Sequence, residues 1–345
     1  MRTSRLHGRL LAVAIGFCAA TTAFARGDAD ENAPILPGLT PEQEETALFV
    51  LGNMLFTFYH EAGHALVSEL DLPVLGREED AVDGLAAVLM IPDEPDRFRD
   101  ELIIAAADGW AMAADQRGDD EPVYWDEHGL DEQRHYAAVC LMAGSDPEGF
   151  AEYAAQTGLP EERVESCKAT YAQTAASWGK LLAPHLKGEG GRKQKRKAGR
   201  IIVSYERDPA FEDEIRFLED SGVIEAAAED LAQNIALPHD LGIVFKSCGE
   251  ENAFWSPEDR QIVLCYELAR AFETLIAKDI AGADPAAGIH APRRRQRLHR
   301  PATSAISGPE SINDAGEVAP TCRSFSSSPQ ARVSPRACAK ARRSR

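Results

Sequence analysis

The feature that most constrains this chain is a long apolar segment, residues 47–70, with the five residues HEAGH inside it. Apolar residues recur there at helical spacing. Thr40 and Pro41 precede an acidic first turn, which is typical of a helix start. We therefore predict one long helix from about Pro41 to Leu70, and any fold of this chain must accommodate the polar motif within it.

The motif itself has the spacing of a metal site. His60 and His64 are four residues apart, so their side chains lie on one helix face and can bind a single zinc ion. Glu61 lies beside them and can act as general base toward a metal-activated water. Zinc lowers the pKa of such a water to about 7. The pattern indicates a metal-dependent hydrolase, with a peptidase as the leading case.

Two histidines leave a catalytic zinc short of a third protein ligand. The next helical segment offers Glu78, Glu79, Asp80 and Asp83. We predict Glu79 as the ligand and Asp83 as the acceptor for the outer N–H of a ligand histidine, because an E-x-x-x-D pair projects from one face. Which of Glu78, Glu79 and Asp80 binds the metal stays open. The alternative is an ordinary acidic helix start, favoured by the helix dipole.

The charge of the chain is uneven. It has 345 residues, 44% of them hydrophobic, with 37 basic and 56 acidic side chains. From Ala286 onward there are 12 basic and 3 acidic residues, so the rest carries 25 against 53, a net of −28. Such an acidic body disfavours nucleic acid and anionic membranes as partners.

The segment 286–345 is rich in Arg, Ser, Pro and Ala and has few large apolar residues. We expect either a disordered basic tail or the product of a frame shift near Asp284, and we assign it no function.

The N-terminus predicts export. Three arginines before residue 10 precede a short apolar run, and Ala23-Phe24-Ala25 has the pattern of a cleavage site. We expect a signal peptide over residues 1–25, cleaved near Ala25, and a leader over residues 26–40. The apolar run is too short for a stable membrane anchor. The mature protein is expected in the periplasm or outside the cell.

Export favours disulfides among the cysteines of the body. Four such cysteines allow three pairings. We predict Cys140–Cys167 and Cys248–Cys265, because each pair closes a short local loop. A zinc-cysteine site is the less favoured alternative, since the sequence contains no CxxC pair.

The remaining segments predict a mostly helical α+β domain over residues 41–285. Trp110 and Trp178 are assigned to its core. A strand is expected over 201–206, and a β-hairpin from two apolar runs, 243–249 and 260–267, around the turn 251–259. Further helices are expected over 77–90, 97–118, 131–144, 145–158, 160–182 and 212–235.

HExxH followed by E-x-x-x-D resembles the zincins whose third ligand is glutamate. Residues 77–92, REEDAVDGLAAVLMIP, resemble the segment after HExxH in peptidases related to ImmA and IrrE. Residues 46–268 as a whole resemble a bacterial exported family of metallopeptidases known only as a domain of unknown function. The matching segments are FVLGNMLFTFYHEAGHALVSELDLPVLGREEDAVD, AAADGWAMAA, WDEHGLDEQRHYAAVCLMAGSDP, LPEERVESC and CGEENAFWSPEDRQIVLCYEL. The resemblance implies a zincin-like core.

The segment NAFW, residues 252–255, resembles the NAxY strand of neprilysin-like peptidases. In those enzymes this edge strand binds the substrate backbone, which would make Asn252 and Ala253 substrate contacts here. The strand follows HExxH in this chain and precedes it in that family, so the resemblance implies a circularly permuted core. An ordinary disulfide-closed hairpin is the open alternative.

His128 and Arg134 resemble the histidine and arginine that neprilysin-like enzymes place against the substrate. This implies His128 as the donor to the oxyanion and Arg134 as the group that binds a substrate carbonyl. His135, Tyr136 and Tyr124 are competing candidates. A single loop histidine is more often a surface residue.

We therefore predict an exported zinc metallopeptidase with one Zn²⁺ and a peptide or protein substrate. The alternative is a non-catalytic exported protein that keeps zinc for structure or binds a peptide on the NAFW segment. The intact Glu61 favours the enzyme, because a structural site needs no base.

Overall fold

The computed structural model describes residues 33–117, 121–187 and 198–282. The expected signal peptide, its cleavage site, most of the leader and the segment 286–345 lie outside these residues. The strands are β1 (Ile201–Tyr205), β2 (Leu241–Lys246), β3 (Ala253–Ser256) and β4 (Gln261–Cys265). The α-helices are α1 (Pro41–Leu70), α2 (Glu78–Met90), α3 (Arg97–Arg117), α4 (Asp131–Ser145), α5 (Ala151–Gln156), α6 (Glu161–Leu182), α7 (Glu212–Ser221), α8 (Val223–Asn234) and α9 (Tyr266–Gly282).

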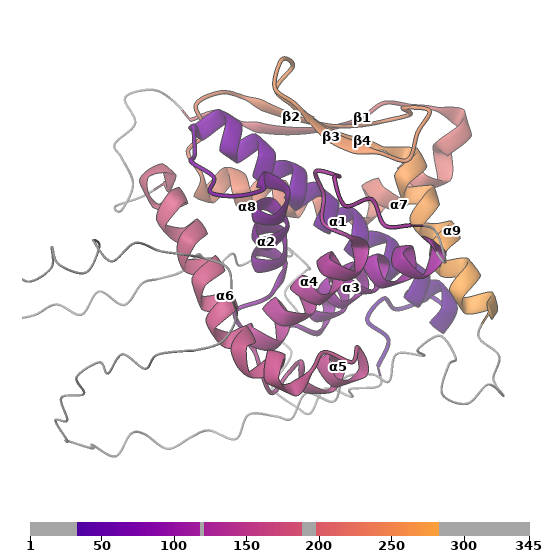
Figure 1. Cartoon of the computed structure of the whole chain (residues 1–345). Helices are drawn as coiled ribbons and strands as arrows, with labels where there is room; N and C mark the ends of the chain where they lie inside the picture. Colours follow the sequence, from indigo (N-terminus) through magenta and orange to yellow (C-terminus); the bar gives the residue numbers. More distant parts are fainter. Residues whose placement is uncertain (1–32, 118–120, 188–197, 283–345) are drawn as a thin grey trace, which may run out of the picture. The chain divides into compact units, whose positions relative to one another are not determined.

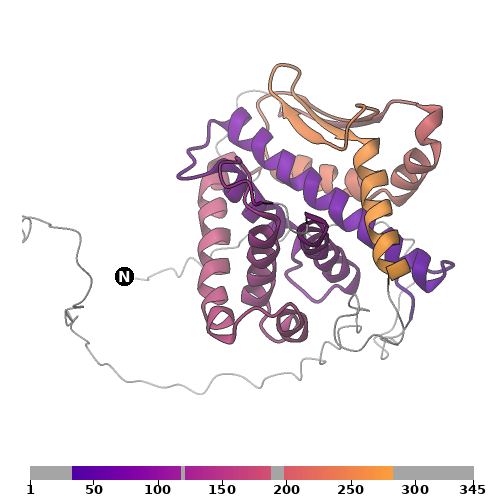
Figure 2. The ribbon, with the colours of Figure 1, turned by 45° about the vertical axis from the view of Figure 1, so that its right-hand side comes forward.

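Helix α1 runs between the sheet on one side and helices α2 and α3 on the other (Figures 1 and 2). It begins with a capping box, in which the Thr40 hydroxyl accepts from the Gln43 backbone and the Gln43 side chain accepts from the Thr40 backbone. It ends where Asp71 takes a left-handed conformation. The predicted bounds of this helix are confirmed.

The four strands form one mixed sheet in the order β1-β2-β4-β3. Strands β1, β2 and β4 are parallel, and β3 is an antiparallel edge strand paired with β4, Phe254 opposite Val263. The predicted hairpin between the two apolar runs is therefore wrong, because β2 and β4 lie side by side in parallel. The segment expected to be their turn contains β3, and the true hairpin is β3–β4.

Two helical expectations also need correction. The segment predicted as one helix over 212–235 is two helices, because Gly222 takes a left-handed conformation with φ of 60°. Helix α9 was not predicted, and it begins at Tyr266, inside the segment expected to be a strand. The buried Tyr266 hydroxyl lies within hydrogen-bond distance of two backbone oxygens, 2.8 Å from that of Glu206 and 3.0 Å from that of Phe245, which fixes this helix against the sheet.

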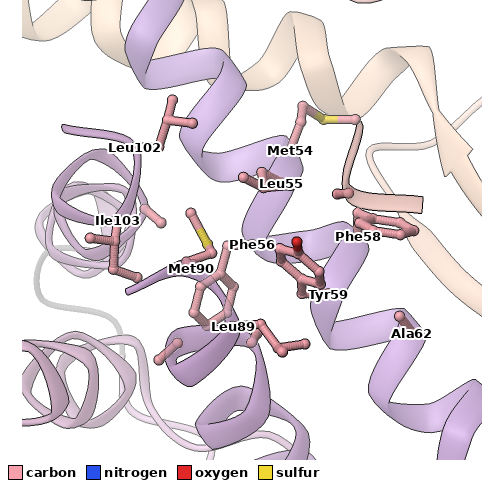
Figure 3. Packing of buried hydrophobic residues seen from close by; sticks show 14 of the residues in the cluster. Met54, Leu55, Phe56, Phe58, Tyr59, Ala62, Leu89, Met90, Leu102 and Ile103 are labelled. Atoms are coloured by element: carbon pink, nitrogen blue, oxygen red, sulfur yellow. The ribbon is translucent and has the colours of Figure 1, made fainter. Parts of the chain in front are cut away.

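The core lies around the middle of α1. Figure 3 shows Phe56, Tyr59 and Met54 of α1 among side chains from α2 and α3 such as Met90 and Ile103, all of them buried. Helices α1 and α3 cross closely at Gly52, where a Cβ atom would lie 2.3 Å from the Leu102 backbone oxygen. The middle of the long apolar helix is thus buried, and HEAGH lies in a fixed place within it.

Both predicted disulfides are present. Cys140–Cys167 joins α4 to α6, and Cys248–Cys265 joins the loop after β2 to the end of β4. No helix among the described residues is long and apolar enough to cross a membrane. The predicted α+β class is confirmed, whereas the zincin-like core and its circular permutation stay predictions.

Candidate metal site

Helices α1 and α2 bring the predicted ligands together. His60 and His64 lie one turn apart on α1, and Glu79 faces them from the first turn of α2. The helices can approach because residue 63 is glycine. A Cβ atom there would lie 2.7 Å from Val82, which stands between Glu79 and Asp83 on α2.

Three side-chain atoms converge on one point. His60 Nε2 and His64 Nε2 are 3.2 Å apart, and Glu79 Oε2 lies 3.1 Å from the first and 3.3 Å from the second. For a tetrahedral zinc with ligands at 2.0–2.1 Å, neighbouring ligand atoms are about 3.3 Å apart. The triangle therefore has the size of one face of a zinc coordination shell, and imidazole and carboxylate are ligands that zinc accepts.

The protons of the two histidines are directed away from this point. His60 Nδ1 lies 2.7 Å from Asp83 Oδ1, and His64 Nδ1 lies 2.8 Å from Glu78 Oε1. A carboxylate can only accept, so each Nδ1 carries a proton, and wherever a ring has no second proton its Nε2 turns a lone pair toward Glu79. Two nitrogen lone pairs and a carboxylate oxygen so close together repel one another unless a cation lies between them.

The electrostatics of the cluster agree with this need for positive charge. Burial lowers the pKa of His60, but its contacts with Asp83 and Glu79 outweigh burial and raise the pKa to about 9. Contact with His60 lowers the pKa of Glu79 to about 2. Glu79 Oε2 is itself buried, and within the described part of the chain it has no partner in hydrogen-bond geometry. A metal ion would satisfy all three atoms without a proton.

Asp83 stands behind His60 and is held by Arg134. Arg134 Nε and Nη2 each donate to the Asp83 carboxylate at 2.7 Å. Burial raises the pKa of Asp83, but the hydrogen bond with His60 and the charge of Arg134 outweigh it and keep the pKa low. Arg134, predicted to bind substrate, is 10% exposed, and Nη1 is its one guanidinium nitrogen without a hydrogen-bond partner among the described residues.

The three acidic residues in the first turn of α2 make different contacts. Glu79 faces the histidine pair, Glu78 accepts from His64, and Asp80 pairs with Arg77. The geometry thus favours Glu79 among the three candidate ligands that the sequence left open. The role of Glu78 as the hydrogen-bond partner of His64 was not predicted, although its place one residue before Glu79 puts it on the same helical turn.

Glu61 lies beside the cluster and is buried. Its Oε1 is 4.0 Å from His60 Nε2, and its side chain is 9% exposed. Burial raises the pKa of Glu61 above the usual range, while the charges of His60 and His64 and a hydrogen bond from the Trp255 backbone N–H oppose the rise. A carboxylate with a raised pKa beside a metal site is suited to accept and return a proton.

His128 reaches the same site from the loop between α3 and α4. Its Nε2 lies 3.0 Å from Glu79 Oε2, and its ring stacks on His60 with 5.8 Å between centroids. Its Nδ1 lies 3.4 Å from Asp126, and its backbone oxygen accepts from Arg77. Its side chain is 47% exposed, whereas those of His60, His64 and Glu79 are mostly buried.

The other candidate oxyanion donors either make hydrogen bonds elsewhere or are exposed to solvent. His135 is buried and its Nδ1 contacts the Ala107 backbone oxygen at 2.8 Å. The Tyr136 hydroxyl donates to the Thr157 backbone at 3.2 Å. Tyr124 is 77% exposed, and no hydrogen bond of its hydroxyl is found among the described residues. His128 is the candidate that contacts the cluster.

Strand β3 passes over α1, and its outer edge pairs with no strand of the described residues. Cys265 donates to the Asn252 backbone oxygen, so residue 252 faces β4. Pairing alternates along an antiparallel strand, which turns the peptide groups of Ala253 and Trp255 toward the free edge. The N–H of Trp255 reaches Glu61 from there. The Asn252 side chain is engaged locally, accepting from the Ala253 N–H at 2.8 Å.

A second group of metal-binding residue types lies where the loop after β2 meets the end of β4. It consists of Cys248, Cys265 and Glu267. Its two cysteines are joined in a disulfide, and Glu267 accepts from the backbone of Cys248 and Gly249. All four body cysteines are in disulfides. The alternative of a zinc-cysteine site among them is therefore excluded.

Comparison with known proteins gives one family. The family model DUF4344, described as "Putative metallopeptidase", matches residues 18–182 and 205–291. The match includes α1 and α2 with the histidine and glutamate cluster, the loop with His128, and the edge strand β3. No curated protein and no solved structure matches the chain.

Proposed function

The chain belongs to this family of "Putative metallopeptidases", and on that premise we propose that it is an exported zinc-dependent peptidase with Glu61 as general base. The observation that carries the proposal is the convergence of His60 Nε2, His64 Nε2 and Glu79 Oε2 at 3.1–3.3 Å from one another, with the buried Glu61 beside them.

His60, His64 and Glu79 would hold the zinc ion, and Asp83 would orient His60. When bound, zinc supplies a water of lowered pKa and polarises the carbonyl of the scissile bond. Glu61 takes a proton from the attacking water and returns it to the leaving amine. Burial raises the pKa of Glu61, which supports this role because a carboxylate with a raised pKa is a stronger base.

We propose that His128 and Arg134 both contact the substrate. His128 Nε2 reaches the edge of the cluster from an exposed loop, so it can donate to the oxygen that becomes negatively charged in the tetrahedral state. Arg134 uses two N–H groups on Asp83 and has Nη1 left for a substrate carbonyl. Both roles follow from the resemblance to neprilysin-like enzymes and agree with the contacts seen here.

The substrate would lie as an extended strand along β3. The outer edge of β3 presents the backbone carbonyls of Ala253 and Trp255, whose N–H groups are held by Asn252 and Glu61, and an extended peptide can donate hydrogen bonds to such an edge. Asn252 would contribute from the exposed start of the strand. This arrangement supports a peptide or unfolded protein segment as substrate.

The two disulfides support a location outside the reducing cytosol. We propose that the protein acts in the periplasm or after secretion. The signal peptide and its cleavage near Ala25 stay part of this proposal.

The test compares Glu61→Gln with Glu69→Gln, the same change two turns further along α1. Glu69 pairs with His239 and Arg260, away from the cluster. Zinc-loaded wild type and Glu69→Gln should cleave a mixed peptide library. Glu61→Gln should bind one zinc and lose about 10²–10⁴-fold in rate. Equal cleavage by both variants would contradict the proposal. Zinc binding without cleavage in the wild type would favour the non-catalytic alternative.

A further inference from the structure

One residue from each of four helices forms a chain of contacts that ends at the metal cluster. Trp110 of α3 lies under the Arg134 guanidinium of α4, with 3.6 Å from the Arg134 Cζ to the ring centroid. Arg134 donates two hydrogen bonds to Asp83 of α2. Asp83 in turn lies 2.7 Å from Nδ1 of His60 on α1. Each residue fixes the next in the series.

Trp110 is an unusual choice for a position that only fills space. Its Nε1 atom is buried and has no hydrogen-bond partner among the residues that the structure describes. A buried donor without a partner costs stability that leucine or phenylalanine would not cost. Its ring is also held by Phe56, which meets it edge to face with 6.0 Å between the ring centroids. What tryptophan offers beyond other apolar residues is the strongest aromatic face for a cation.

We propose that Trp110 is a positioning residue for the metal site, and that its ring face sets the Arg134 guanidinium that holds Asp83 against His60. The proposal rests on the proposed function, since it concerns the same zinc site. Stacking fixes the plane of the guanidinium, and a planar guanidinium can meet both oxygens of Asp83 only in a narrow range of orientations. Partners of this kind behind a ligand histidine commonly contribute 10- to 100-fold to metal affinity.

The competing explanation is that Trp110 serves only to fill the space between α1, α3 and α4. The two explanations differ in what they require of the side chain. Packing requires apolar volume, of which methionine supplies nearly as much as phenylalanine does. Positioning requires an aromatic face, which phenylalanine keeps although its ring is smaller.

The experiment measures zinc affinity of the full-length protein by competition with a chelator. Trp110→Phe should remain within about threefold of the wild type, since a π face remains under the guanidinium. Trp110→Met should lose about tenfold. Ile276→Ala is the control, because it removes a buried side chain of α9 that packs with Phe49 and Ala105 in a small cluster separate from the main core. That variant should lose stability and keep its zinc affinity.

A second readout is the visible absorption spectrum of the cobalt-substituted protein. Trp110→Met should change the spectrum, because the orientation of His60 is less fixed, whereas Ile276→Ala should not. Equal zinc affinity in the wild type and Trp110→Met would overturn the inference, as would equal losses in the Met and Phe variants. Failure of the wild type to bind zinc would count against the proposed function instead.

Should Trp110→Met not fold, a double-mutant cycle between Trp110→Phe and Arg134→Lys decides the matter. The positioning role predicts that their effects on zinc affinity are not additive, because both weaken one contact. Additive effects would overturn it.

Discussion

The two sides of the metal site are built differently. On the ligand side, His60 and Glu79 project from packed helices, with side chains 6% and 16% exposed. On the substrate side, His128 stands on a loop with its side chain 47% exposed, and β3 offers an unpaired edge. The ligand side is held by carboxylates and Arg134 before any metal binds, which suits preorganised coordination. The substrate side is open, which suits the entry of a peptide.

The largest expected effect separates these two sides directly. His128→Gln should lower kcat/KM by about 10²–10³-fold, the usual cost of losing one oxyanion donor. Zinc affinity should change little, because His128 lies outside the ligand triangle. Steady-state kinetics and a chelator competition measure the two quantities. A parallel fall in zinc affinity would move His128 to the ligand side and contradict its proposed role.

The next effect compares the partners of the two ligand histidines. Asp83→Asn should weaken zinc binding by about 10–100-fold, because it disrupts a buried hydrogen bond that also involves Arg134. Glu78→Gln should cost less than about tenfold, since Glu78 is 43% exposed and water can replace it. Isothermal titration of both variants measures this difference. Equal losses would mean that burial does not distinguish the two histidines.

A smaller effect should follow from separating the two ligand helices. Gly63→Ala places a methyl group against Val82 and should cost about 1–3 kcal/mol of the free energy of unfolding. Zinc binding should weaken as well, because Glu79 moves with α2. Gly282→Ala is the matched control, since a Cβ atom there meets nothing within 4 Å. Denaturant unfolding that gives the same value for both variants would show that α2 has room to move.

The smallest effect concerns Glu61 in the metal-free protein. Burial raises the pKa of Glu61, so its ionised form costs stability once the pH is above the usual value of 4.5. Glu61→Gln should therefore unfold at a higher temperature at pH 7, by about 2–4 °C per kcal/mol gained. The difference should shrink as the pH falls toward 4.5, where the wild-type carboxyl group becomes protonated. A lower Tm for the variant would show that the carboxylate is stabilised in place.

The ligand side was largely predictable because its information is local. The spacing of His60 and His64 and that of Glu79 and Asp83 follow from the period of one helix. The structure brings these residues together. Their roles as ligands and partner stay predictions.

The substrate side depended on contacts that spacing does not encode. Two apolar runs suggested a hairpin, and nothing in them distinguished an antiparallel pair from the parallel pair β2–β4 that the structure contains. The hydrogen bonds from Arg134 to Asp83 join residues 51 positions apart and were not predicted, for the same reason. A resemblance pointed to Arg134 as functional. Its partner, Asp83, could not be identified without knowing that α2 packs against α4.

The most direct test of the account is X-ray absorption spectroscopy of the zinc-loaded protein. We predict one zinc ion with two imidazole nitrogens and a carboxylate oxygen, all at about 2.0–2.2 Å, and no sulfur ligand. Loss of one oxygen ligand in Glu79→Gln, with Glu78→Gln unchanged, would complete the assignment. A sulfur shell at about 2.3 Å, or a protein that retains no zinc, would contradict the account.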